Sequence, residues 1–150
     1  AERRGAPVVA FVRIDNEPIK RRCQVLAPDF LIVQDEALMH IPSITDGLKP
    51  GGNILLNASR SSEDFAEGGD ASHMITLPAT QLAQQHLGRP VPNTALLSAF
   101  LKLTDILPQS SLIHALGERF KGDVLDKNIA LIEAAAATMP SNLWKEAENA

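Results

Sequence analysis

Apolar residues near the start of the chain fall into two extended runs. Residues 7–14 (PVVAFVRI) are rich in β-branched and aromatic side chains, and residues 18–25 follow after the polar turn sequence DNE. Two extended runs joined by a short polar turn are typical of a β-hairpin. We therefore expect an N-terminal hairpin with a buried first strand and a second strand that exposes Lys20 and Arg22 on one face.

Three further apolar runs predict the buried strands of a sheet. Each run is short and bounded by turn-forming residues, as expected for strands that are covered on both faces. The runs are FLIVQD at 30–35, NILLN at 53–57 and MITL at 74–77. Between the first two, the sequence predicts short helical pieces on either side of Pro42 and then a tight turn at KPGG.

The composition of residues 59–72 indicates a polar surface loop. The segment is small, acidic and glycine-containing, with Phe65 as its one large apolar anchor. A plain linker and an active-site lid both fit this composition. The linker is favoured because nothing in the segment supplies a clear catalytic group.

The second half of the chain changes to the apolar spacing of helices. One helix is expected from 79 to 87 with Gly88 at its end, and another begins at Asn93 and runs to about 103. A third begins at Ser110 and ends at Gly122, and a last one ends before Pro140. Trp144 is then the expected anchor of the polar residues that follow.

Strands that alternate with helices and give way to helices alone indicate an α/β fold. The expected architecture is a mixed, mainly parallel, doubly wound-like sheet with an N-terminal β-hairpin and a helical C-terminal part. A length of 150 residues fits one ordinary domain. We assign residues 1–140 to this domain and residues 141–150 to a polar tail.

Composition and charge narrow the classes of function. The chain is 45% hydrophobic and 21% charged, with no stretch near the ~20 apolar residues that cross a bilayer and no signal-peptide pattern. We therefore expect a cytoplasmic protein without a membrane partner. The net charge of -4 hides a basic start, which is either a solvated face or a site for phosphate or an acidic partner surface. The start lacks interleaved aromatics and the whole chain is acidic, which argues against nucleic acid.

The usual motifs of metal, nucleophilic and nucleotide chemistry are missing. His40, His73, His86 and His114 have no metal-binding spacing, so no metal site is expected. Cys23 is the only cysteine, which excludes an internal disulfide and an iron–sulfur cluster held by this chain alone. It is either a small apolar filler or a thiolate favoured by nearby guanidiniums. Without a nucleophile elbow or a glycine-rich phosphate loop, no catalytic residue is assigned.

An ordered set of segments resembles a known family. The segments are ERRGAPVVAFVRID, PDFLIVQD, LKPGGNILLN, GRPVPNTALLSAF and KNIALI, which together span about residues 2–133. They resemble the gamma subunit of 2-oxoacid:ferredoxin oxidoreductases of the pyruvate synthase type, and ERRGAPV with GRPVPNTALL is the most specific part. The family's glycine-rich strand and turn, G-R-G-G-Q-G, does not precede ERRG here. We therefore expect the gamma-type domain at 1–140 to be N-terminally incomplete.

The resemblance implies a non-redox gamma subunit that is not active alone. Its complex converts a 2-oxoacid, expected to be pyruvate, and coenzyme A into an acyl-coenzyme A and CO2 while reducing ferredoxin. The expected partners are alpha, beta and delta subunits, with ferredoxin reached through them. Thiamine diphosphate and iron–sulfur clusters are expected on the partners, which agrees with a chain that has one cysteine.

The resemblance also implies that this domain helps to enclose the active site and accommodate coenzyme A. Arg3 and Arg4 suit phosphate groups, and Gly5 allows a close backbone approach. Asn93 and Thr94 open a helix whose N-terminus favours an anion, with simple capping as the plainer interpretation. Asn57 ends a strand where open α/β sheets contact ligands, with turn formation as the alternative.

Two other functions fit the residues. One is a stand-alone binding or assembly module with no catalytic role. The other is a methyl-transferring doubly wound enzyme, which is supported only by the Pro-Gly-Gly turn and strand of LKPGGNILLN. The glycine-rich cofactor loop that such an enzyme needs is absent from the sequence.

Overall fold

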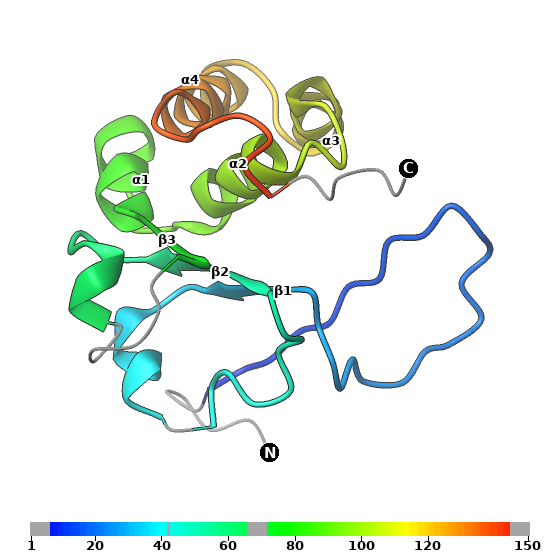
Figure 1. Cartoon of the computed structure of the whole chain (residues 1–150). Helices are drawn as coiled ribbons and strands as arrows, with labels where there is room; N and C mark the ends of the chain where they lie inside the picture. The colour runs from blue at the N-terminus through cyan, green and yellow to red at the C-terminus, as the bar shows by residue number, and fades with distance from the viewer. Residues whose placement is uncertain (1–6, 42, 66–71, 145–150) are drawn as a thin grey trace.

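The fold is built on a three-stranded parallel sheet (Figure 1). The computed structural model of the chain describes residues 7–41, 43–65 and 72–144. Strands β1 (Phe30–Val33), β2 (Asn53–Asn57) and β3 (Met74–Leu77) lie in the order β1-β2-β3, all running the same way. The residues that follow these strands therefore gather at one edge of the sheet, which we call the carboxyl edge.

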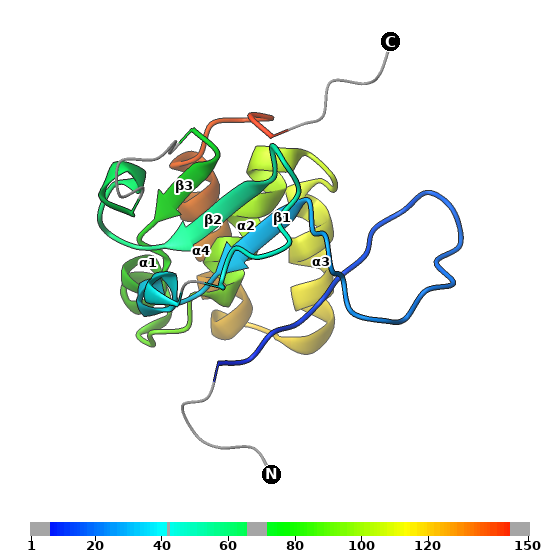
Figure 2. The same ribbon diagram turned by 60° about the horizontal axis from the view of Figure 1, so that its bottom comes forward.

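Helices cover one face of this sheet. They are α1 (Ala79–Leu87), α2 (Asn93–Thr104), α3 (Gln109–Arg119) and α4 (Asp123–Ala137). Two 3-10 helices, η1 (Glu36–His40) and η2 (Ser62–Phe65), follow β1 and β2 respectively. Figure 1 shows the four α-helices on one side of the sheet and η1 on the other, and Figure 2 shows the same layers with the sheet in front of the helices.

Side-chain alternation along β2 divides the core between the two faces of the sheet. Leu55 is fully buried on the helical face, where it clusters with Leu77 and Leu96. Its neighbours on β2 belong to a second cluster, on the face that carries η1 and η2, which includes Leu38 and Phe65. Burying a leucine side chain contributes about 2 kcal/mol to the stability of the fold. Both faces of β2 are covered, and the side chains in the middle of the strand are therefore apolar on both faces.

The α/β class, the parallel strand pairing and the helical C-terminal part predicted from the sequence are confirmed. Helix α1 ends at Gly88, whose φ of 67° is the left-handed conformation expected of a helix-ending glycine. The predicted N-terminal caps of α2 and α3, Asn93 and Ser110, are not at the N-cap positions in the structure. Pro92 and Pro108 hold these positions, so that Asn93 is the first residue of α2. Trp144 is 7% exposed, as expected for an anchor.

The predicted N-terminal β-hairpin is wrong for this structure. Residues 7–28, which we call the arm, contain no strand and extend away from the sheet as the blue loop in Figure 1. A two-stranded hairpin is marginal in water unless a third strand or a helix packs on it, and no strand or helix of the described residues pairs with the arm. The described part of the sheet is parallel throughout, with α-helices on one face, rather than mixed and doubly wound.

Candidate functional site

Asn57 lies at the carboxyl edge and joins three elements. Its Nδ2 donates hydrogen bonds to the Gln34 carbonyl oxygen after β1 and to Thr80 Oγ1 in α1, both at 2.8 Å. Its Oδ1 accepts from the Thr80 backbone N–H at 3.2 Å. Both amide hydrogens of this 9%-exposed side chain are therefore used inside the protein, and only the remaining Oδ1 lone pair is left for a ligand.

A second group of polar side chains surrounds this point. Arg60 Nη2 lies 3.6 Å from Glu36 Oε1, and the Arg60 guanidinium stacks 4.3 Å from the centre of the Phe65 ring. Ser59 Oγ accepts a hydrogen bond from Gln81 Nε2 at 2.9 Å. The sequence prediction named Phe65 as an anchor but missed Arg60. The signal that was available is its position just after a buried strand, where open α/β sheets place ligand-contacting groups.

The other predicted site residues do not join Asn57 in a shared hydrogen bond among the described residues. Asn93 and Thr94 begin α2, beyond α1, and Asn93 Oδ1 accepts from the Thr94 backbone N–H at 3.0 Å. Thr80, which Asn57 contacts, lies at the start of α1, and Asn93 follows the end of that helix. The helix between them is about 13 Å long at 1.5 Å per residue. Arg3, Arg4 and Gly5 lie outside the described residues.

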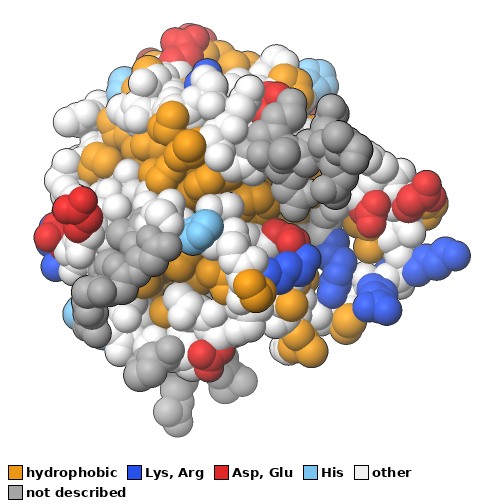
Figure 3. All heavy atoms as spheres, viewed as in Figure 1, with side chains coloured by type: hydrophobic (Ala, Val, Ile, Leu, Met, Phe, Trp, Pro, Cys, Tyr) orange, Lys and Arg blue, Asp and Glu red, His pale blue; other side chains and the backbone are white. Residues whose placement is uncertain are grey.

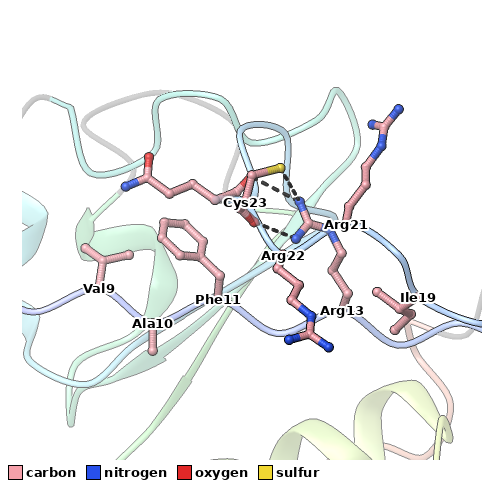
Figure 4. A pocket seen from close by; sticks show the side chains of 9 residues that line it. Val9, Ala10, Phe11, Arg13, Ile19, Arg21, Arg22 and Cys23 are labelled. Atoms are coloured by element: carbon pink, nitrogen blue, oxygen red, sulfur yellow. Dashed lines mark hydrogen bonds between the residues drawn. The ribbon is translucent and has the colours of Figure 1, made fainter.

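The arm is held in a loop by one of its own cationic side chains (Figure 4). Arg13 Nη1 donates to the Cys23 carbonyl oxygen at 2.6 Å, and Nη2 donates to the Gln24 carbonyl oxygen at 3.0 Å. The Cys23 sulfur is 3.8 Å from Nη2, and the residue is exposed. An open hollow of about 420 Å³ lies between residues 9–13 and residues 19–24 of the arm. Its lining mixes apolar and cationic side chains, among them Val9, Phe11, Arg13, Ile19, Arg21 and Arg22.

The residues of this chain do not provide the ligands of an iron–sulfur cluster. A cubane cluster needs several cysteine ligands, and the chain has Cys23 alone, so its residues do not fit an iron–sulfur cluster. Among residues 7–41, 43–65 and 72–144, no three His, Cys, Asp or Glu side chains come together as metal ligands.

No helix in that part of the chain is both long and apolar enough to span a bilayer.

Comparison with known proteins assigns the chain to a family. The pyruvate ferredoxin/flavodoxin oxidoreductase family matches residues 1–138. The pyruvate synthase subunit PorC of Methanothermobacter thermautotrophicus is 45% identical over 127 residues, which are 85% of this chain and 68% of the relative. The common gamma subunit of the pyruvate/ketoisovalerate oxidoreductases of Thermococcus kodakarensis is 38% identical over 136 residues, covering 89% of this chain and 74% of the relative.

A solved structure agrees with the sequence relatives. The crystal structure of the pyruvate oxidoreductase subunit PORC from Thermotoga maritima superposes with a TM-score of 0.70 at 28% identity, over 75% of this chain and 64% of that one. The match therefore spans slightly less than two thirds of that subunit. The segment LKPGGNILLN, which suggested a methyl-transferring enzyme, forms a turn and β2 within this fold. The chain belongs to the pyruvate ferredoxin/flavodoxin oxidoreductase family, among its gamma subunits.

Proposed function

We propose that this chain works in a complex that oxidatively decarboxylates pyruvate to acetyl-coenzyme A and CO2 and passes the electrons to ferredoxin. The observation that carries the proposal is the 45% identity to a pyruvate synthase subunit over 85% of the chain. That stretch takes in most of the chain, so the likeness is not confined to one motif. The relatives named as common to pyruvate and ketoisovalerate enzymes support a subunit that does not itself choose the 2-oxoacid.

Partner chains supply the redox chemistry in this proposal. Alpha, beta and delta subunits carry the thiamine diphosphate and the iron–sulfur clusters, since Cys23 alone cannot hold a cluster. Thiamine diphosphate, where it is bound, stabilises the carbanion that forms when CO2 leaves. Ferredoxin then receives electrons from those partner chains and not from the gamma subunit.

The contribution of this chain is to help accommodate coenzyme A, whose phosphates need cationic partners. Arg3 and Arg4 would supply bidentate, charge-assisted hydrogen bonds, and Gly5 would let the backbone approach closely. Asn93 and Thr94 are placed at the N-terminal end of α2, where the helix dipole favours negative charge. Asn93 is exposed, so it is free to face a ligand.

Charge reversal in the assembled enzyme tests this role. The complex is purified with its partner subunits, and coenzyme A-dependent pyruvate oxidation is followed with a low-potential dye. We expect Arg3→Glu with Arg4→Glu to raise the KM for coenzyme A about tenfold, the loss expected for about 1.4 kcal/mol of binding. The matched control, Arg119→Glu with Lys121→Glu, reverses two exposed cations at the end of α3 and should leave that KM unchanged.

Three results would count against the proposal or against one of its residues. A purified chain that forms no complex with thiamine-binding and cluster-binding subunits would favour a stand-alone binding module. An unchanged coenzyme A KM and unchanged assembly in the arginine variant would remove Arg3 and Arg4 from the site. Asn93→Ala with lower stability but normal coenzyme A binding would leave Asn93 with a structural role alone.

A further inference from the structure

Arg60 is the cation that the fold places where the three strands end. It comes soon after Asn57, the last residue of β2, and no other Lys or Arg occurs in the segments that follow the strands, residues 34–41, 58–65 and 78–87. Figure 3 shows Lys and Arg side chains gathered on the arm, at the right, and acidic side chains at the left, the side toward which the strands run in Figure 1. An anion that binds at the carboxyl edge would therefore meet Arg60 as its cationic partner.

Two contacts fix the Arg60 guanidinium without using up its donors. The guanidinium lies 4.3 Å from the centre of the Phe65 ring, and this cation–π contact uses no N–H. Its Nη2 is 3.6 Å from Glu36 Oε1, which is longer than the about 2.8 Å of a charge-assisted hydrogen bond. The side chain makes no hydrogen bond to another described residue. The guanidinium is therefore positioned, and its N–H groups remain available to a ligand.

Two other carboxylates near this point are engaged with the backbone. Asp35 Oδ1 accepts from the Ala37 N–H at 3.0 Å, and Asp64 Oδ2 accepts from the Ser61 N–H at 3.1 Å. Among the described residues, Glu36 alone forms an ion pair with Arg60. The carboxyl edge therefore presents one guanidinium donor and one carboxylate acceptor side by side.

A ribose that bears a hydroxyl and a phosphate on neighbouring carbons matches this pair of groups. The phosphate accepts hydrogen bonds, and a guanidinium donates two of them in parallel. The hydroxyl donates a hydrogen bond, and a carboxylate accepts it. In open α/β sheets that bind dinucleotides, a carboxylate binds a ribose hydroxyl and an arginine nearby accommodates a ribose phosphate. Coenzyme A has such a ribose, with a 2′-hydroxyl beside its 3′-phosphate.

We infer that Arg60 binds the 3′-phosphate of coenzyme A and that Glu36 accepts a hydrogen bond from the neighbouring 2′-hydroxyl. The inference rests on the proposed function, because the ligand is the coenzyme A of the same reaction. Phe65 is a positioning residue, which acts through the guanidinium. The Glu36 carboxylate repels the phosphate, but water reaches this half-exposed pair and screens the repulsion. The diphosphate of coenzyme A is left to the other cations of the proposed site.

Dephospho-coenzyme A, which lacks the 3′-phosphate and keeps the rest of the molecule, tests this contact in the purified complex. Isothermal titration calorimetry without a 2-oxoacid measures Kd, and the parent complex should bind coenzyme A about tenfold more tightly than dephospho-coenzyme A. Arg60→Gln should raise Kd and KM for coenzyme A about tenfold and those for dephospho-coenzyme A less than about twofold. Arg60→Lys keeps the charge without the planar fork and should raise the values for coenzyme A about threefold.

Lys49→Gln is the matched control. Lys49 is another half-exposed cation paired with a carboxylate, that of Asp29, and it precedes β2 at the opposite edge of the sheet, so its loss should change neither Kd. Equal binding of the two ligands by the parent complex, or an Arg60→Gln complex that binds coenzyme A normally or loses both ligands equally, would overturn the inference and leave the proposed function standing. A parent complex that oxidises pyruvate without coenzyme A would overturn both.

Discussion

Asn57 and Thr80 are joined by two hydrogen bonds that run in opposite directions. Asn57 Nδ2 donates to Thr80 Oγ1 at 2.8 Å, and the Thr80 backbone N–H donates to Asn57 Oδ1 at 3.2 Å. The pair ties the last residue of β2 to the first turn of α1, at the edge where ligands of open α/β sheets bind. The same amide also holds the carbonyl oxygen of Gln34 after β1.

Removing this amide should loosen the carboxyl edge. Asn57→Ala leaves the Thr80 N–H and the Gln34 carbonyl without partners, so we expect a loss of about 2 kcal/mol in the free energy of unfolding. Thr80→Val keeps the N–H bond and should lose about 1 kcal/mol. Urea denaturation measures both, with Asn93→Ala as an exposed control expected within about 0.5 kcal/mol of the parent chain. We call the hydrogen bonds of Asn57 to Gln34 and Thr80 the clamp. Equal stability of Asn57→Ala and the parent chain would show that the clamp does not stabilise the fold.

The same variants distinguish a clamp from a ligand contact. If Asn57 contacts coenzyme A through its remaining lone pair, Asn57→Ala raises the coenzyme A KM in the assembled enzyme and Thr80→Val does not. We expect the clamp to be the larger effect, because both amide hydrogens already have partners. The measurement is the KM for coenzyme A at a temperature where both variants are folded.

Gly47 and Gly51 offer a matched pair for testing how the arm is fixed. Both have positive φ, 82° and 78°. A Cβ at Gly47 would lie 2.3 Å from the Leu26 carbonyl oxygen, whereas a Cβ at Gly51 meets nothing within 4 Å. We expect Gly51→Ala to lose about 1 kcal/mol from backbone strain alone, and Gly47→Ala to lose more, because Leu26 must also move.

Hydrogen exchange should register that movement at the base of the arm. The Lys49 amide, bonded to the Pro28 carbonyl oxygen, should exchange faster in Gly47→Ala than in Gly51→Ala. Equal stabilities and equal exchange for the two variants would show that Leu26 does not pack against Gly47.

Ser98 connects three helices from inside the core. Its Oγ donates to the Ile132 carbonyl oxygen in α4 at 2.7 Å and lies 3.1 Å from Gln109 Oε1 in α3. Gln109 Nε2 in turn donates to the Ser98 carbonyl oxygen at 2.7 Å. Because Ser98 is fully buried, Ser98→Ala should lower the free energy of unfolding by about 1–2 kcal/mol. Ser111→Ala, at an exposed position of α3, is the control, and a similar loss in both would remove the special role of Ser98.

The sequence predicts the parts of the fold that are locally determined. The apolar run around Leu55 is a central strand because both faces are covered, and Gly88 ends α1 because glycine adopts its positive φ at little steric cost. The arm was predicted as a hairpin on the same grounds, but strand formation needs a neighbour, and β propensity alone does not supply one. The local composition of the arm favours an extended backbone but does not show whether another strand lies beside it.

The candidate site is harder to predict because it depends on distant contacts. Asn57 is correctly placed at a strand end, but its hydrogen bonds to Gln34 and Thr80 span 23 positions in each direction. No local pattern indicates that its donors are already used. The stacking of Arg60 on Phe65 is local in sequence, but it depends on the turn formed by η2.

Trp144 and Phe30 supply a built-in optical test of the C-terminal packing. Their rings stack with centroids 6.1 Å apart and planes at 29°, and the Trp144 backbone N–H donates to the Leu103 carbonyl oxygen at 2.8 Å. Phe30 also meets Phe100 edge to face at 5.3 Å. Since Trp144 is the single tryptophan and is 7% exposed, its fluorescence reports the surroundings of this one side chain, which include the Phe30 ring.

Phe30→Leu should weaken the ring contacts while keeping an apolar residue in β1. We expect a loss of about 1–2 kcal/mol in the free energy of unfolding, together with a shift of tryptophan emission to longer wavelength in the folded state. Phe120→Leu, at a residue that is 39% exposed, should change neither quantity. Emission that stays at the parent wavelength in Phe30→Leu would show that the Leu103 hydrogen bond and the surrounding α2 residues hold Trp144 without the aromatic stack.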